Sequence, residues 1–598
     1  MKVADWILAR LAQEGVKTIF FVPGGAAMHL NNAIANHPEI EAVANLHEQA
    51  SAIAAEACAR ITGELGVCMV TAGPGGTNAV TGVAGAFLDS TACLFLSGQV
   101  KRADLKKGTG LRQLGVQEID IVSIVSSVTK YAVTVTEPND IRWHFEKALH
   151  LALTGRRGPV WLDLPLDVQG AMIDAATLRP YIPEMGPAKP DVELPAKVAR
   201  VLELLARAER PVLIAGNGIR LAGAQDLFLP IVERFGLPML TTWLGLDLVP
   251  NAHDLFFGRP GSVAPRGANF ALQNSDLLIV LGARLDMALT GYAHDRFARG
   301  AKKVVIDIDA AEIAKLKMSV EVPVVADAGD FLREFDRQSA GKQVLEIAPW
   351  RTRCREWKKK YPIVLPEHFA PVDAVTTYGF AEALSQELAE GDIIAPGASG
   401  AGIEIFLLAL RMKAGQRCFH NRGMGAMGYG LPSAIGACIG SGRKPTVCVD
   451  GDGGFQFNVQ ELETVARLKL PMKIFILDNQ GYASIRTSQK RYFGRLVGSD
   501  PASGMTVPDT VKIAAAYGLK TARIASSQKL REAIRAVLAI EGPVLCNVVT
   551  PPDEPRQPSL TSYQKPDGSM GSKPLEDLWP FLDRDEFRSN MIVPLIED

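Results

Sequence analysis

Two short polar segments, each at the end of an apolar run, contain residue types suited to binding a metal ion. Asp452 lies between Gly451 and Gly453, and 24 residues separate this triplet from Asp478 and Asn479. Carboxylate and amide oxygens suit Mg²⁺ better than zinc, and Mg²⁺ in proteins usually keeps phosphate oxygens and water as ligands. The glycines let the backbone approach a phosphate, and a helix N-terminus behind them would favour an anion. A bare Gly-Asp-Gly is more often a structural turn, but the second segment favours a diphosphate held through a metal.

The elements that must position these residues are parallel strands and their crossover helices. Short Val/Ile/Leu-rich runs alternate with helix-length amphipathic segments, which predicts parallel α/β sheets. The polar segments end two predicted strands, 445–453 and 473–479, and a predicted helix over 455–468 completes a βαβ crossover that brings the strand ends together. Further buried strands are predicted at 18–22, 66–72, 159–164, 211–216, 276–282, 303–309 and 543–549.

Composition excludes several classes of protein. The chain has 598 residues, 47% of them hydrophobic and 22% charged, with a net charge of −1. Nothing in this balance attracts nucleic acid or an anionic membrane. The eight cysteines never approach CxxC spacing, and no apolar run reaches the ~18 residues of a membrane span. The N-terminal pattern is an amphipathic helix without the apolar core of a signal peptide, so we expect a cytoplasmic protein.

Two interruptions divide the predicted elements into domains. Residues 178–195 contain five prolines and are typical of a linker, and residues 340–372 suggest a second connection. We therefore expect domains at 1–177, 190–342 and 368–550. The segment 551–598 is rich in Pro, Ser and Gly but contains large apolar residues, which favours an arm packed on the body or a lid.

The Gly-Asp-Gly triplet, the spacing and the terminal Asn resemble those of the thiamin-diphosphate (ThDP) enzymes. Further segments are similar to the acetohydroxyacid (acetolactate) synthase and pyruvate oxidase branch: 21–26, 45–78, 85–100, 115–122 and 423–437. Together they extend over the chain to about residue 550. The resemblance implies three doubly wound parallel-sheet α/β domains, which are pyrimidine-binding, central FAD/ADP-binding-like and diphosphate-binding in chain order.

The resemblance also implies catalytic positions in the first domain. Glu48, in the sequence HEQ, is similar to the glutamate that hydrogen-bonds N1′ of the aminopyrimidine and so promotes formation of the C2 ylid. That task requires a carboxyl group partly removed from water, with a pKa matched to proton exchange. A lone HEQ is more often an exposed helix start, but the apolar run that follows is consistent with burial. Gly25 and Gln117 match positions near the reacting substrate.

Other positions are implied to hold the cofactor. Met427 is similar to the bulky residue that wedges the two cofactor rings into a V shape, and Gly425 would offer its carbonyl to the 4′-amino group. Asp452, Asn479 and the Gly481 carbonyl would hold Mg²⁺. Positions implied to lie at the diphosphate are Ser399, Gly451, Gly453 and Gly454.

The middle of the chain resembles the FAD-binding domain of the acetohydroxyacid synthases. The implied flavin positions are Gly216, Gly218, Gly282, Arg284, Asp307 and Asp327. Ala288 stands where the synthases have a second basic residue, which departs from the pattern. A domain that keeps the fold without flavin is the alternative.

One departure bears on the second substrate. Ser488 stands where the synthases have the tryptophan that helps select the acceptor, and serine leaves a larger, more polar space. We therefore expect a ThDP- and Mg²⁺-dependent carboligase that decarboxylates pyruvate and transfers the acetyl unit to a second ketone, aldehyde or 2-keto acid, as the yersiniose-type enzymes do. The alternatives are an acetolactate synthase, a 2-keto acid decarboxylase or oxidase, and a non-catalytic ThDP-binding scaffold. The family resemblance implies a homodimer or homotetramer.

Overall fold

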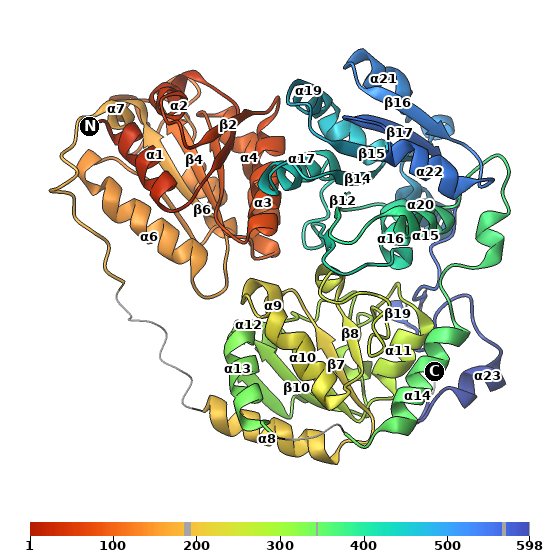
Figure 1. The fold of residues 1–598 in the computed structure, drawn as a ribbon. Helices are drawn as coiled ribbons and strands as arrows, with labels where there is room; N and C mark the ends of the chain where they lie inside the picture. The colour runs from red at the N-terminus through yellow and green to blue at the C-terminus, as the bar shows by residue number, and fades with distance from the viewer. Residues whose placement is uncertain (184–192, 342–344, 565–567, 569, 597–598) are drawn as a thin grey trace.

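Three lobes, each built on one parallel sheet, make up the computed structural model (Figure 1). The structure describes residues 1–183, 193–341, 345–564, 568 and 570–596. The expected fold class is confirmed, and every strand predicted from the sequence is present. Residues 184–192 of the predicted 178–195 linker lie outside the described residues. Within the described ranges, every helix is too short or too polar for a membrane span.

The N-terminal sheet has the strand order β2-β1-β3-β4-β6-β5. Its strands are β1 Thr18–Phe21, β2 Glu41–Ala44, β3 Gly66–Val70, β4 Cys93–Gln99, β5 Tyr131–Thr134 and β6 Val160–Pro165. Both faces are covered, so alternate residues of β3 enter different cores: Val67 and Met69 one, Cys68 and Val70 the other. The helices are α1 Val3–Gln13, α2 Met28–Ala35, α3 Glu48–Thr62, α4 Pro74–Leu88, α5 Ile121–Val125, α6 Ile141–Leu153 and α7 Leu166–Gly170.

The central sheet has the order β11-β10-β9-β7-β8. Its strands are β7 Pro211–Ala215, β8 Met239–Thr241, β9 Leu277–Leu281, β10 Lys302–Asp307 and β11 Val322–Val325. Its helices are α8 Leu194–Arg207, α9 Gly218–Leu221, α10 Gln225–Phe235, α11 Arg266–Gln273, α12 Ala310–Ala314, α13 Ala328–Gln338 and α14 Ala348–Lys360. Helix α14 lies within the expected second connection, 340–372, and its Trp350 and Trp357 are buried against this sheet.

The C-terminal sheet has the order β13-β12-β14-β15-β17-β16. Its strands are β12 Ile393–Pro396, β13 Arg417–Cys418, β14 Thr446–Gly451, β15 Met472–Asp478, β16 Lys520–Ile524 and β17 Val544–Val549. The chain order reverses between β12 and β14, and such switch points are where open α/β sheets bind ligands. The helices are α15 Thr377–Glu387, α16 Ala401–Ala409, α17 Gly430–Gly440, α18 Asp452–Phe455, α19 Leu462–Arg467, α20 Ala483–Phe493, α21 Thr510–Ala516 and α22 Leu530–Leu538.

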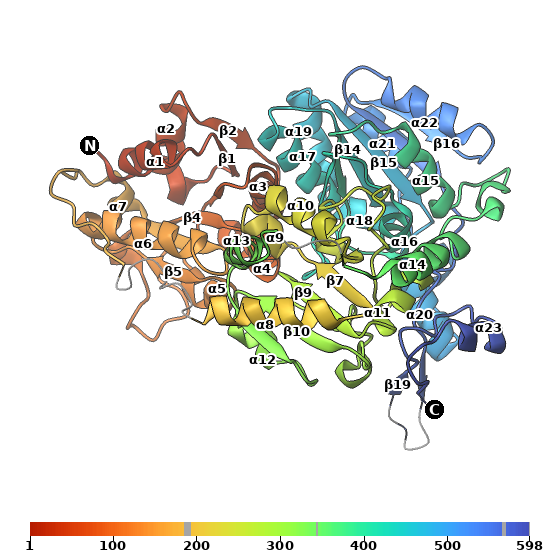
Figure 2. The ribbon, with the colours of Figure 1, turned by 60° about the horizontal axis from the view of Figure 1, so that its bottom comes forward.

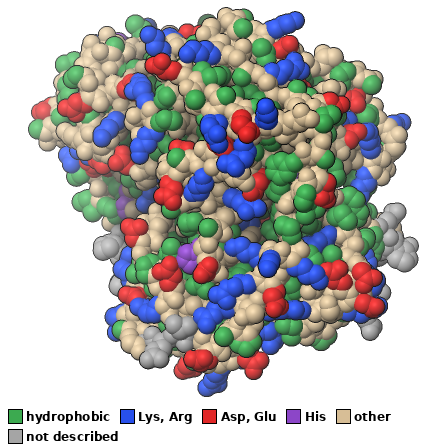
Figure 3. Space-filling model, turned by 45° about the vertical axis from the view of Figure 1, so that its right-hand side comes forward, with side chains coloured by type: hydrophobic (Ala, Val, Ile, Leu, Met, Phe, Trp, Pro, Cys, Tyr) green, Lys and Arg blue, Asp and Glu red, His purple; other side chains and the backbone are tan. Residues whose placement is uncertain are grey.

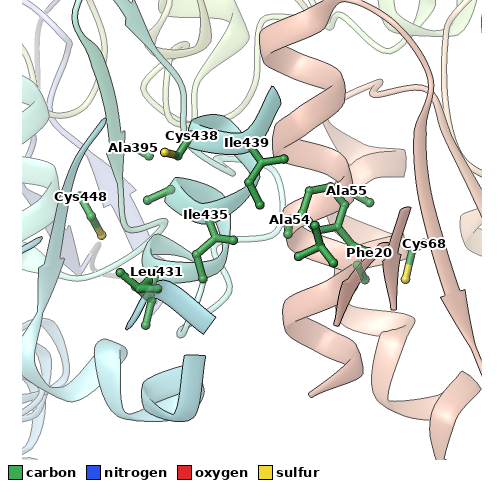
Figure 4. Packing of buried hydrophobic residues seen from close by; sticks show 14 of the residues in the cluster. Phe20, Ala54, Ala55, Cys68, Ala395, Leu431, Ile435, Cys438, Ile439 and Cys448 are labelled. Carbon is green, nitrogen blue, oxygen red and sulfur yellow. The ribbon is translucent and has the colours of Figure 1, made fainter. Parts of the chain in front are cut away.

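Helices α3 and α17 join the first and third domains into one core. Ala54 and Ala55 of α3 face Ile435 and Ile439 of α17 (Figure 4). The backbones approach closely, because a Cβ on Gly436 would lie 2.1 Å from the carbonyl oxygen of Ala54. Only glycine permits this contact, so the first and third domains pack closely against each other.

The crossover between β14 and β15 differs from its prediction as one helix over 455–468. It consists of α18, a 3-10 segment Gln456–Glu461 and α19, with Asn458 at non-helical backbone angles (φ −133°, ψ 29°). The side chain of Asn458 donates to Gly428 O at 2.8 Å and to Gln49 Oε1 at 3.0 Å. These tertiary bonds outweigh the local helical preference at this position.

The C-terminal segment returns to the central domain as an arm. Its elements are β18 Ser562–Gln564, β19 Met570–Ser572 and α23 Arg584–Ser589, and α23 lies beside α14 (Figure 1). Arg266 donates to Leu578 O at 2.9 Å, and Asn274 donates to Asn590 O at 2.9 Å. Strand β19 lies at the edge of the molecule, away from the three sheets (Figure 2).

Candidate cofactor site

The predicted metal-binding residues of the third domain lie together at the ends of β14 and β15. Asp452 follows β14 at the start of α18, and its Oδ1 and Oδ2 accept from Gly453 N at 2.8 Å and Gly481 N at 3.0 Å. Asn479 follows β15, with its side-chain oxygen 2.7 Å from Gly481 O and 3.2 Å from Asp452 Oδ1. Three acceptor oxygens, from Asp452, Asn479 and the Gly481 carbonyl, therefore converge. The Asn479 and Asp452 residues are both buried.

Two arrangements of the Asn479 amide account for this convergence. If the amide is rotated, its nitrogen donates to both oxygens. If it is not rotated, the three oxygens need a cation between them, and ligands at right angles around Mg²⁺ at 2.0–2.1 Å lie about 3 Å apart. Spacings of 2.7 and 3.2 Å fit either arrangement, and in the unrotated one the donor set of carboxylate, amide and carbonyl oxygens suits Mg²⁺. In the described ranges, no three His, Cys, Asp or Glu residues gather as an alternative metal site.

Burial makes the charge on Asp452 costly without a cation. The pKa of its carboxyl is raised to about 7, chiefly by burial and also by the Asp478 carboxylate. The hydrogen bond from Gly481 N–H acts in the opposite direction and lowers the pKa. A divalent cation at these oxygens would stabilise the ionised form.

The glycines predicted at the diphosphate have different surroundings. Space is open where a Cβ on Gly451 would point, whereas a Cβ on Gly453 would lie 2.6 Å from the Tyr482 ring. Gly453 is therefore required by the packing of Tyr482, and the Cβ side of Gly451 is free for a ligand. Gly454 packs near Asp450, and Ser399 lies half-buried in the loop after β12, at the switch point.

The predicted catalytic residues of the first domain lie at the corresponding edge of its own sheet. Glu48 is the first residue of α3, and its Oε2 accepts from Asn78 Nδ2 at 2.9 Å. The Glu48 residue is half-buried, so it is less enclosed in the single chain than its expected role requires. Gly25 begins a 3-10 turn with open space beside it, and Gln117 has a left-handed φ of 64°.

The remaining ThDP and acceptor positions face open space. Met427 is 38% exposed despite its apolar side chain, and Gly425 beside it has φ 65° with nothing near its Cβ position. Ser488 is exposed on α20, with its hydroxyl donating to Ser484 O at 3.0 Å. Among the described residues, no side-chain hydrogen bond links Glu48 to Asp452 or Asn479 within one chain.

Sequence reasoning missed Glu461, which ties the two domains together just before Glu48. Its Oε1 accepts from Leu46 N at 2.9 Å and His47 N at 3.1 Å, and its Oε2 accepts from Asn45 Nδ2 at 2.9 Å. Glu461 is fully buried. Its segment is predicted as an amphipathic helix, in which a glutamate is expected on the solvated face, so the pattern contained no signal for this role.

A cavity of about 1390 Å³ lies against the central domain and is bordered by all three domains. Five of the six predicted flavin positions line it: Gly218, Gly282, Arg284, Asp307 and Asp327. Gly216 does not line the cavity. A Cβ on Gly216 would lie 2.1 Å from Gly282 O, so this glycine permits close packing of two loops. The Arg284 Nε atom is buried and has no hydrogen-bond partner among the described residues, and burial raises the pKa of Asp307.

Comparison with known families defines the class of protein. Profiles described as "Thiamine pyrophosphate enzyme" match the N-terminal TPP binding domain at residues 1–124, the central domain at 198–335 and the C-terminal TPP binding domain at 403–548. The chain belongs to the thiamine pyrophosphate (ThDP) enzyme family and, as its relatives indicate, to the acetolactate-synthase-like branch of it.

The curated relatives match over nearly the whole chain. "Probable acetolactate synthase large subunit" of Methanocaldococcus jannaschii is 34% identical over 93% of this chain and 93% of its own length. "Acetolactate synthase large subunit" of Corynebacterium glutamicum is 34% identical over 98% of this chain and 92% of its own length. "Acetolactate synthase, chloroplastic" of Arabidopsis thaliana is 34% identical over 94% of this chain and 83% of its own length. The chain is therefore a ThDP-dependent enzyme.

Proposed function

We propose that this enzyme decarboxylates pyruvate and joins the resulting acetyl unit to a second carbonyl compound. The observation that carries the proposal is the convergence of the oxygens of Asp452, Asn479 and Gly481 at the ends of neighbouring strands. These oxygens would hold Mg²⁺ on the cofactor diphosphate. When bound, ThDP would supply the carbanion chemistry by acting as an electron sink.

The chain's own residues would bind and orient the cofactor and move one proton. Met427 and the Gly425 carbonyl would hold its ring system, and Ser399 with Gly451 would approach the diphosphate. The Glu48 carboxyl would exchange a proton with N1′ of the aminopyrimidine. Asn78, which donates to Glu48, keeps that carboxylate oriented. Gly25 and Gln117 would contact the substrate.

We propose that the complete site forms in a homodimer or homotetramer. Glu48 and Met427 are both partly exposed in the single chain, although one is expected to act in enclosed surroundings and the other is apolar. A second copy that covers these residues would supply that enclosure and exclude water from the reacting carbon. On the face shown in Figure 3, Lys and Arg side chains lie among Asp and Glu side chains.

The acceptor has two candidates, each favoured by a specific observation. The names of the relatives favour a second 2-keto acid, which would give acetolactate or an acetohydroxyacid. Ser488 in place of a large aromatic residue favours a bulkier or more polar ketone or aldehyde. Product analysis with pyruvate, ThDP and Mg²⁺, with and without an added bulky ketone, separates them. A tertiary alcohol formed from the ketone supports the open acceptor pocket, and acetolactate unaffected by the ketone supports the synthase.

We further propose that the central cavity binds FAD. The volume of about 1390 Å³, two strand-end glycines and the buried Arg284 Nε, which no described residue pairs, support a dinucleotide ligand. The test is the absorption spectrum of the purified protein before and after incubation with FAD and removal of free flavin. Flavin bands that persist support the proposal, and protein that neither contains nor retains flavin would exclude it.

A further inference from the structure

Arg486 is a fully buried arginine directed at the backbone of the metal-binding loop. It lies on α20, is 2% exposed, and is among the largest completely enclosed side chains of the protein. Its guanidinium donates to Asn479 O at 3.0 Å and, with longer bonds, to Gln480 O at 3.4 Å and Ser499 O at 3.3 Å. Two of these carbonyls belong to the loop that contains the predicted Mg²⁺ positions.

The same guanidinium also holds the start of the C-terminal arm. It donates to Pro552 O and to Asp553 Oδ1, the latter at 3.0 Å. Asp553 is shared with Lys490, whose Nζ lies 2.6 Å from the other carboxylate oxygen. Arg486 therefore joins three segments that are separate in sequence: the metal-binding loop, the loop at Ser499 and the arm.

The conformation of the metal-binding loop requires such a donor. Gln480 and Gly481 have positive φ values of 61° and 122°, so the carbonyls of this loop are not paired as in a regular helix or strand. Gly481 leaves no room for a side chain, because a Cβ would lie 2.6 Å from Ser499 O. Buried carbonyls without donors are costly, and the planar guanidinium satisfies several at once.

We infer that Arg486 is a positioning residue that sets the loop 479–481 in its metal-binding conformation, with Asp553 holding the guanidinium in place. The inference rests on the proposed Mg²⁺ and ThDP site. Partners that orient metal ligands in this way commonly change metal affinity by about 10- to 100-fold when removed. Among the described residues, Arg486 donates to backbone carbonyls and to Asp553 and to none of the predicted Mg²⁺-binding oxygens, so its effect is exerted through the backbone.

The test is calorimetric titration of Mg²⁺ into the full-length protein at saturating ThDP. We expect Arg486→Met to weaken apparent Mg²⁺ affinity about 10- to 100-fold. Arg486→Lys should weaken it less, because the lysine ammonium group still donates hydrogen bonds. Asp553→Asn should weaken it several-fold with the guanidinium still present. Lys490→Met is the matched control, since it removes the other partner of Asp553, and its affinity should stay within twofold of wild type.

The thermal midpoint of the metal-free protein separates positioning from simple stabilisation. Equal Mg²⁺ affinity in wild type, Arg486→Lys and Asp553→Asn would overturn the inference even if their midpoints fall. If Arg486→Met fails to fold, the Mg²⁺ affinities of Arg486→Lys and Asp553→Asn still test the inference. A wild-type protein that binds neither Mg²⁺ nor ThDP would overturn both the proposed function and this inference, whereas normal wild-type binding with unaffected variants overturns only the latter.

Discussion

At the scale of single residues, the chemistry rests on a few polar groups whose surroundings decide their roles. The proximity of Asp452 and Asn479 was predictable, because both end strands joined by one crossover. Glu461, Asn458 and Arg486 were not predictable. Each is polar in a segment with an amphipathic pattern, and nothing in a single sequence distinguishes a buried, fully paired polar side chain from a solvated one.

Asp452→Asn should abolish Mg²⁺-dependent binding of ThDP. The amide retains one oxygen but loses the charge that balances the cation, so we expect affinity for ThDP in the presence of Mg²⁺ to fall by at least about 100-fold. Calorimetric titration of ThDP measures this loss. Asp585→Asn, at a side chain that is 91% exposed, is the control and should bind as wild type does. Unchanged ThDP affinity in Asp452→Asn would remove this residue from the metal site.

Glu48→Gln should separate turnover from cofactor binding. Glutamine can still accept the bond from Asn78, so the start of α3 should keep its geometry, but it cannot exchange a proton. We expect turnover to fall about 10²- to 10⁴-fold while ThDP affinity changes little. Steady-state rates and ThDP titration of the same preparation test this, and wild-type turnover in the variant would refute the catalytic assignment.

At the scale of elements, the polar residues of the candidate site lie at the ends of parallel strands. All the predicted strands were found, because runs buried on both faces are strongly apolar. The break between α18 and α19 escaped prediction, since it depends on bonds from Asn458 to residues far away in the chain. The N-terminal sheet has a similar polar cluster, where Asp163 of β6 accepts from Ser97 Oγ at 2.6 Å and Thr134 Oγ1 at 2.9 Å.

The Asp163 cluster predicts a pH dependence of stability. Burial raises the pKa of Asp163 to about 6 from 3.8, against bonds from Ser97, Gln99 and Thr134 that lower it. Between these values the folded state holds a proton that the unfolded state has lost, so stability falls as pH rises from about 4 to about 6. The contribution is at most about 3 kcal/mol.

Asp163→Asn removes this titration. Calorimetry from pH 4 to pH 7.5 gives the thermal midpoints of wild type and variant. As pH rises, the midpoint of the wild type should fall relative to that of the variant. A difference that is flat across this window would contradict the raised pKa. The Asp585→Asn variant, whose side chain is exposed, should show no such trend.

At the scale of the whole molecule, the first and third domains share a core across α3 and α17, and the arm ties the third domain back to the central one. Three domains were foreseeable from the two interruptions, 178–195 and 340–372, in the alternation of strands and helices. The packing between them was not, because it depends on contacts such as Gly436 against Ala54 that lie far apart in the sequence. Packed in this way, the single chain leaves Glu48 and Met427 partly exposed, which motivates a site completed by a second copy.

Mixing two inactive variants tests that assembly. If Glu48 of one copy acts with Asp452 of the other, hybrids of Glu48→Gln and Asp452→Asn contain one intact site per dimer. Dissociating and reassociating an equal mixture should then restore about a quarter of wild-type activity, by random pairing of subunits that each contribute to two sites. Activity that stays at the level of the separate variants, in mixtures shown to exchange subunits, would contradict a shared site.

The central claim is tested most directly by following [2-¹³C]pyruvate by NMR with the purified enzyme. With both ThDP and Mg²⁺ present, we predict loss of the keto resonance, release of CO₂ and a new carbon–carbon bonded product that contains the labelled carbon, and none of these when either is omitted. Unchanged pyruvate in the complete mixture, or conversion to acetaldehyde or acetate without any ligated product, would contradict a pyruvate-dependent carboligase.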